Sequence, residues 1–276
     1  MKAKKRALCV GINIFEHLPE ASLKGCVNDA HAMAGLLKER MGFAEDEILL
    51  LTDAAATRDA VLTALREMVT GAVVGRYGYL VFSFSSHGTQ VPDLDGDEDD
   101  SADEAFCPYD TAVRGDGWDR DHIILDDELC DLTALVPRNC LFEVFLDTCH
   151  SGTGLRAMDF IMDRRPRFLP PPSLAAFRRL ENVPVRGWRE KCLERACRSQ
   201  VLWAACRADQ TSADARIDGD WHGAFTYEFC KAMASDASSS LTRSQILRKV
   251  RALLHGRYTQ IPQLECSPTL RNAGWS

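Results

Sequence analysis

The sequence predicts a single α/β domain whose central sheet has about six mostly parallel strands, with helices on both faces. Short apolar runs alternate along the chain with longer stretches of helical periodicity. The apolar runs are nearly continuous, as in strands that are buried on both faces. The length of 276 residues suits one large domain, and 46% hydrophobic with 26% charged residues excludes disorder and coiled coil.

Five short apolar runs predict strands, at residues 7–12, 47–51, 79–84, 141–146 and 201–205. Helices are expected between and after them, at 29–40, 57–70, 126–135, 225–233 and 243–255. The last helix has the clearest signal, because Thr242 and Gln245 form a capping box and apolar residues follow at helical spacing. This alternation of strand and helix predicts crossover connections and hence parallel pairing.

A basic insertion is expected between the fourth and fifth strands. Residues 156–198 hold eleven Lys and Arg against five Asp and Glu, and include a tri-proline at 170–172 that cannot continue a helix. We therefore divide the domain into residues 1–155, an exposed linker at 156–199, and residues 200–276. Arginines without interleaved aromatic residues, on a chain of net charge −7, do not indicate nucleic-acid binding.

Neither a membrane span nor a cysteine framework is expected. No apolar run approaches the ~18 residues of a membrane helix, and the basic start at 1–6 leads into only a short apolar stretch, so the prediction is a cytoplasmic protein without a membrane partner. The eleven cysteines are odd in number and include no C-x-x-C pair, which argues against structural zinc and disulfides.

Two of the predicted strands end in polar turns that carry reactive side chains. His87 and Gly88 follow the third strand, and Cys149 follows the fourth. The carboxyl ends of parallel strands meet at one edge of a sheet, so these side chains can form a Cys-His dyad there. His87 would act as base and then acid, and the amides of Gly88 and Cys149 would form the oxyanion hole. His150 is a competing base, but it points to the opposite side in an extended segment.

The motifs around these residues resemble a known family. The block 87–90, the acidic run that ends at 103–104, and the sequence Asp-Thr-Cys-His-Ser-Gly at 147–152 are similar to metacaspases and bacterial caspase-like cysteine proteases of the caspase superfamily (clan CD, family C14). Further matches lie at 23–30, 209–214 and 223–227, so the resemblance spans nearly the whole chain. It implies a caspase-like fold and a cysteine endopeptidase that cuts proteins or peptides after Arg or Lys.

The resemblance also implies site residues. His87 and Cys149 correspond to the dyad, and Asp29, Ser85 and Asp147 to the pocket for the basic side chain of the substrate. Two carboxylates suit a guanidinium, which presents several N–H donors in a fixed fork. The alternative for Asp29 is the N-cap of the first helix.

The chemistry itself requires no cofactor, but Ca²⁺ is an expected activator by resemblance. Eight of the twelve residues at 93–104 are acidic, and oxygen ligands suit Ca²⁺. The matching ligands are Asp103, Asp126 and Asp127, although Asp126 and Asp127 also fit the start of a helix. Arg156 stands where the family has a further carboxylate, which weakens the expectation.

Control by self-cleavage is a further expectation, since the basic insertion offers Arg164, Arg165, Arg178 and Arg179 to an Arg-selective enzyme. Three alternatives stay open. Instead of a calcium-activated cysteine endopeptidase, the chain could be a catalytically silent caspase-like scaffold or a cysteine enzyme of other chemistry, such as acyl transfer. The third alternative is a protease switched on by a small signalling ligand instead of Ca²⁺. The oligomeric state is left open.

Overall fold

A six-stranded sheet forms the centre of the protein in the computed structural model, which describes residues 4–92, 102–150, 164–180, 185–186, 199–235 and 240–275. Five neighbouring strands are parallel, and the edge strand β15 is antiparallel. The order across the sheet is β15 (Gln263–Cys266), β12 (Gln200–Ala204), β9 (Leu141–Asp147), β3 (Tyr77–Ser85), β1 (Lys4–Gly11) and β2 (Ile48–Thr52). The predicted fold class is confirmed.

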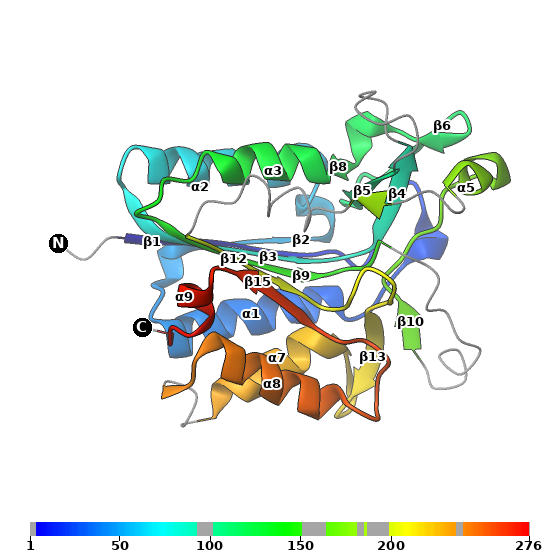
Figure 1. The fold of residues 1–276 in the computed structure, drawn as a ribbon. Helices are drawn as coiled ribbons and strands as arrows, with labels where there is room; N and C mark the ends of the chain where they lie inside the picture. The colour runs from blue at the N-terminus through cyan, green and yellow to red at the C-terminus, as the bar shows by residue number, and fades with distance from the viewer. Residues whose placement is uncertain are drawn as a thin grey trace.

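Helices cover both faces of this sheet (Figure 1). On one face lie α2 (Arg58–Val73) and α3 (Asp126–Ala134), and on the other α1 (Cys26–Met41), α7 (Ala224–Ala234) and α8 (Arg243–Leu254). Each face has its own apolar core, because alternate residues of one strand point to opposite sides, as Leu8 and Cys9 do. All five predicted strands and all five predicted helices are present, with ends that differ by zero to three residues.

The strand ends that carry the reactive turns are surrounded by smaller sheets. The strands β4 (Gly88–Pro92), β5 (Ala102–Phe106) and β8 (Ile124–Leu125) pair antiparallel beside the end of β3. A second small sheet contains β10 (Arg164–Pro166), β13 (Ala213–Ile217) and β14 (Asp220–Gly223). Figure 1 shows both groups at the same end of the central sheet.

The remaining elements of the described residues are short. They are the strands β6 (Val113–Arg114), β7 (Gly117–Trp118) and β11 (Val185–Arg186), the helices α5 (Leu174–Leu180) and α9 (Pro268–Arg271), and four 3-10 turns at Pro19–Ala21, Glu45–Glu47, Asp53–Ala55 and Arg120–His122. Among the described residues, no helix has both the length and the apolar character to cross a membrane.

A buried ion pair anchors α8 to the central sheet. Glu143 on β9 is fully buried and accepts hydrogen bonds from the Arg243 guanidinium, with Nε 2.9 Å from Oε1. The Arg243 guanidinium also lies 4.8 Å from the centroid of the Trp275 ring. Each charge therefore has a partner inside the core, which is the condition for burying it.

Candidate active site

The turns after β3 and β9 place His87 and Cys149 at the same edge of the sheet. These strands are parallel neighbours, and their last residues, Ser85 and Asp147, are paired in register. His87 and Cys149 each follow two residues later, and both are buried, with 5% and 1% of their surface exposed. The described hydrogen bonds do not join the two side chains directly.

The imidazole of His87 is oriented by the backbone. Its Nε2 lies 2.7 Å from the carbonyl oxygen of Ala21, so Nε2 carries the proton and donates it. The other ring nitrogen, Nδ1, is buried and has no hydrogen-bond partner among the described residues. Burial lowers the pKa of His87 from its ordinary value to about 4, so the ring is neutral at pH 7 and Nδ1 carries no proton.

The thiol of Cys149 lies against the segment before β13. The backbone N–H of Ser212 donates to Sγ, and the Cys206 sulfur lies 4.0 Å away. Burial raises the pKa of Cys149 well above the ordinary value for a thiol, and the neighbouring Cys206 adds to this increase. The thiol is therefore protonated in this state and needs a base before it can act as a nucleophile.

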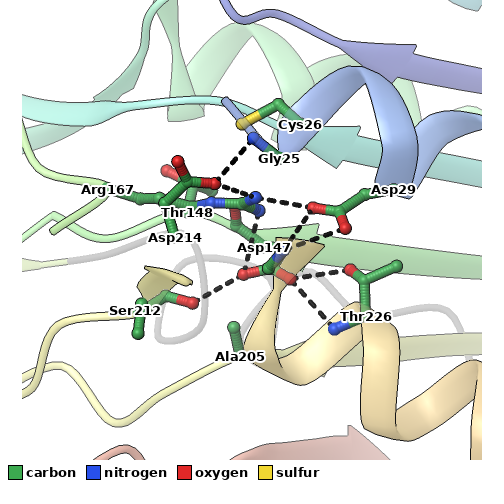
Figure 2. Close-up of polar contacts among 12 residues, drawn as sticks. Gly25, Cys26, Asp29, Asp147, Thr148, Arg167, Ala205, Ser212, Asp214 and Thr226 are labelled. Atoms are coloured by element: carbon green, nitrogen blue, oxygen red, sulfur yellow. Dashed lines mark hydrogen bonds and ion pairs between the residues drawn. The ribbon is translucent and has the colours of Figure 1, made fainter. Parts of the chain in front are cut away.

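Three carboxylates from distant parts of the sequence meet beside the thiol. Asp29 lies in the first turn of α1, Asp147 ends β9, and Asp214 lies on β13. All three are buried. Figure 2 shows them arranged around one guanidinium, that of Arg167, whose side chain has no exposed surface.

Arg167 forms an ion pair with each of the three acids. Its Nη2 lies 2.6 Å from Asp29 Oδ2 and 3.0 Å from Asp214 Oδ1, and its Nη1 lies 3.2 Å from Asp147 Oδ1. Burial disfavours the charge, but the carboxylates outweigh it and keep the pKa of Arg167 well above its ordinary value. The pocket thus holds a charged arginine by both of its terminal nitrogens.

Neighbouring backbone and hydroxyl groups fix the carboxylates in place. Asp147 accepts hydrogen bonds from the hydroxyls of Ser212 and Thr226, at 2.6 and 2.7 Å. Asp29 accepts from the N–H of Gly223 at 2.9 Å. A Cβ atom at position 223 would lie 2.3 Å from Asp147 Oδ2, so only glycine leaves room for the pocket. The acceptors are thus oriented toward the guanidinium before any other ligand arrives.

The main chain at Arg167 is bound as closely as its side chain. Its carbonyl oxygen accepts hydrogen bonds from the N–H groups of Gly88, at 3.0 Å, and Cys149, at 3.2 Å. These are the two amides predicted for the oxyanion hole. The N–H of Arg167 donates to the carbonyl of Ser212 at 3.0 Å, and β10 just before it pairs antiparallel with β13. Residues 164–167 therefore lie as an added strand beside β13, in the site formed by His87, Cys149 and the three acids, which we call the cleft.

This arrangement corrects the prediction for the basic insertion. Arg167 and Phe168 are buried, because three carboxylates and two backbone amides bind Arg167 inside the protein, whereas Arg164 is half-buried and Arg165 is exposed. Arg167 was not among the four arginines proposed for self-cleavage. Of those, Arg178 is exposed on α5, and the side chain of Arg179 lies outside the described residues. Arg156 also lies outside them.

The structure brings together most of the predicted pocket. Asp29 and Asp147 both contact Arg167, and Asp29 is no N-cap, because α1 begins at Cys26 and its N-cap is Gly25. Ser85 lies beside Asp147 in the sheet, but its buried hydroxyl has no hydrogen-bond partner among the described residues. Asp214 was missed as a pocket residue, although it ends the segment 209–214 that carries the resemblance.

His150 belongs to a different environment from Cys149. Its ring packs edge-on against Phe106 at 4.7 Å, and its Nδ1 lies 3.4 Å from the carbonyl of Thr89. Its Nε2 lies 3.8 Å from Glu104, on β5. These contacts hold the ring on the β4–β5 side of the turn, as expected for consecutive side chains in an extended segment.

The three acids predicted as calcium ligands lie together. Ligand atoms of Asp103, Asp126 and Asp127 are all within 4.8 Å of one another. The pairing of β5 with β8 causes this, because it sets Asp103 near the start of α3. The donor set consists of carboxylate oxygens only, which suits a hard cation such as Ca²⁺. Most of the acidic run, at 93–101, lies outside the described residues.

Comparison with known proteins agrees with this geometry. The sequence matches the caspase domain family over residues 4–273. It is 33% identical to Metacaspase-1 of Cryptococcus neoformans, over 96% of the chain and 62% of that protein, and 30% identical to Metacaspase-1 of Pyricularia oryzae, over 97% and 72%. The chain thus spans somewhat less than two thirds of the Cryptococcus relative.

Solved structures show the same fold. A protein from Geobacter sulfurreducens superposes with a TM-score of 0.66 at 25% identity, covering 98% of this chain and 97% of the other. Caspase-1 from Spodoptera frugiperda superposes with a TM-score of 0.59 at 11% identity, covering 96% and 87%. The latter likeness concerns the fold alone.

Proposed function

The chain belongs to the caspase domain family, and from this premise we propose that it is a cysteine peptidase of metacaspase type that cuts peptide bonds after arginine. We propose further that its own Arg167–Phe168 bond is a substrate. The observation that carries both proposals is the binding of Arg167, with its side chain among three carboxylates and its carbonyl oxygen on two amides. A bound substrate needs both of these contacts.

The pocket geometry supports arginine over lysine. The two terminal nitrogens of the guanidinium contact different acids, with Asp29 and Asp214 on one and Asp147 on the other. A lysine has one ammonium at the end of a flexible stem and cannot contact all three acids with the same fork geometry. Lysine is therefore expected as a weaker substrate, and an acidic residue as none.

The proposed reaction begins with a neutral thiol and a neutral imidazole. Nδ1 of His87 takes the proton of the Cys149 thiol as the sulfur attacks the carbonyl carbon of Arg167, since burial disfavours a free pair of thiolate and imidazolium. The amides of Gly88 and Cys149 stabilise the oxyanion, since they already bind this oxygen at 3.0 and 3.2 Å. Nδ1 then gives its proton to the leaving nitrogen of Phe168, the C–N bond breaks, and water hydrolyses the thioester.

Before it is cut, the same segment blocks the cleft. The pocket and both oxyanion donors are occupied by Arg167, so no other arginine can bind there at the same time. Cleavage after Arg167 leaves it at a chain end that can depart. We therefore propose self-processing as the activating step.

The test is the mass of the self-cleavage products. Full-length wild-type protein should yield two fragments that end at Arg167 and begin at Phe168, whereas Cys149→Ala should stay intact. Arg167→Lys should cut more slowly at the same bond. The matched control is Arg178→Ala, which removes an exposed arginine of the same insertion and should cut as wild type does.

Three outcomes would contradict the proposal. These are cleavage of the Cys149→Ala protein, cleavage of the wild type at another residue only, and a wild type that stays intact and hydrolyses no fluorogenic peptide ending in Arg. The last result, together with a thiol that resists alkylation, would favour the catalytically silent scaffold.

We also propose Ca²⁺ as the activating ion, bound by Asp103, Asp126 and Asp127. The support is the close approach of their ligand atoms, together with the strand pairing that connects these acids to the oxyanion hole. Asp103 lies on β5, which pairs with β4, and β4 begins at Gly88, whose amide serves the oxyanion hole. A bound Ca²⁺ would offset the repulsion among the three acids and so stabilise β5 where it pairs with β4. This pairing in turn fixes the position of the Gly88 amide.

A further inference from the structure

We propose that Tyr258 forms a second arginine subsite in the cleft, which selects a guanidinium on the residue three positions before the arginine at which substrates are cut. This inference rests on the proposed function, because it takes residues 164–167 as a bound substrate. It assigns a specificity role to a residue that neither the motifs nor the resemblance singled out.

The contact that supports it lies between Arg164 and the Tyr258 ring. The guanidinium carbon of Arg164 is 4.4 Å from the ring centroid, within the range of a cation–π interaction. Arg164 is three residues before Arg167, which fills the main pocket. The two arginines of one extended segment thus occupy two separate binding places.

Backbone pairing fixes the register between these two places. Arg164 pairs with Ala215 and Pro166 with Ala213 in the antiparallel ladder between β10 and β13. The next residue, Arg167, donates its N–H to Ser212. A substrate that pairs with β13 in this way places its last residue before the cut bond, an arginine, in the main pocket. The residue three positions earlier then lies over Tyr258.

The ring belongs to a segment that is itself well anchored. The N–H of Tyr258 donates to the carbonyl of Leu254 at the end of α8. Two residues later, the Gln260 side chain accepts from the N–H of Ala213 at 3.0 Å and donates to the carbonyl of Ala205 at 3.0 Å. The segment that carries the ring is thus held next to β13 by bonds that do not involve β10, so these bonds would persist after Arg164 departs.

The charges around the ring permit a second cation. Arg257 also lies 5.9 Å from the centroid of the Tyr258 ring, but its guanidinium is paired with Glu228 at 3.1 Å. The acid offsets the repulsion that an unpaired Arg257 would exert on an incoming arginine. A planar guanidinium also stacks on an aromatic face, so arginine is favoured over alanine at this position.

The experiment compares two fluorogenic peptides that differ only at this position, Arg-Arg-Pro-Arg and Ala-Arg-Pro-Arg. With the self-processed full chain, kcat/KM should be about two- to fivefold higher for the first peptide, as expected for a partly exposed cation–π contact. Tyr258→Phe keeps an aromatic ring and should keep the preference. Tyr258→Leu should bring the ratio of the two rates close to one.

The matched control is Tyr77→Leu, which removes another partly buried tyrosine with an arginine near its ring, at the opposite end of the sheet. It should retain the wild-type ratio. Equal rates for both peptides in the wild type, or a preference that survives in Tyr258→Leu, would overturn the subsite while leaving cleavage after arginine intact. No cleavage of either peptide would overturn the proposed function and the subsite together.

Discussion

Asp214→Asn is the most informative change in the proposed pocket. The substitution keeps the shape of the side chain and removes one of the three charges that bind the guanidinium. The carboxylate of Asp214 lies 3.0 Å from Nη2 of Arg167 and also accepts from the backbone N–H groups of Lys24 and Gly25, each at 2.9 Å. The amide of asparagine can still accept one of these bonds, so the loop before α1 keeps an anchor.

The size of the effect follows from the charge that is lost. A hydrogen bond to a charged group contributes about 1.5–3 kcal/mol, and each ~1.4 kcal/mol is a factor of ten. Two carboxylates, Asp29 and Asp147, still bind the arginine in the variant. We therefore expect kcat/KM for an arginine peptide to fall by about 10- to 100-fold.

The assay is hydrolysis of one arginine peptide by self-processed wild type and variants at pH 7.5. The control is Asp218→Asn, four residues further along, because Asp218 is exposed, is hydrogen-bonded by Tyr227, and makes no described contact with Arg167. It should cut within about twofold of wild type. An Asp214→Asn enzyme as fast as that control would refute the assignment of Asp214 to the pocket.

Three further predictions concern stability and ion binding. The pKa of His87 in the folded state is about 4, below its ordinary value, so protonation of this ring favours the unfolded state. As pH falls from about 7 to below 4, the free energy of unfolding of the wild type should therefore drop by about 3 kcal/mol more than that of His87→Gln. Urea unfolding measures this difference, and parallel pH curves for the two proteins would contradict it. Arg243→Met should cost about 3–5 kcal/mol, because Glu143 stays buried without its partner. The double change Arg243→Met with Glu143→Leu should recover most of this loss in thermal melts, and an unchanged melting temperature in the single variant would count against the ion pair. Millimolar Ca²⁺ should raise the melting temperature of Cys149→Ala but not of the same protein with Asp126→Asn, and equal shifts would exclude this site.

Local patterns were sufficient for the central layers of the fold. Continuous apolar runs predict buried parallel strands, and the capping box at Thr242 marks the start of α8 where the structure has it. The antiparallel edge strand β15 was missed, since only one of its four residues is buried and its apolar signal is weak. The strands β10, β13 and β14 were missed because their sequences hold few large apolar residues and several charged ones.

The site was predictable in part. Strand ends could place His87 and Cys149 together because parallel strands share one carboxyl edge. The burial of Arg167 could not be predicted in this way, because it depends on acids at positions 29, 147 and 214 that only the complete fold brings together. A basic segment that contains a tri-proline has the composition of an exposed loop, and nothing in its own sequence indicates an ionic partner.

The segment in the cleft and the cleft itself are parts of one polypeptide. Dilution therefore does not release the segment, because its local concentration is set by its connection to the chain and not by the amount of protein in solution. The occupied state should be present in every molecule from the time it folds. Self-processing within the molecule should then follow first-order kinetics, with a half-time that is the same at nanomolar and micromolar protein.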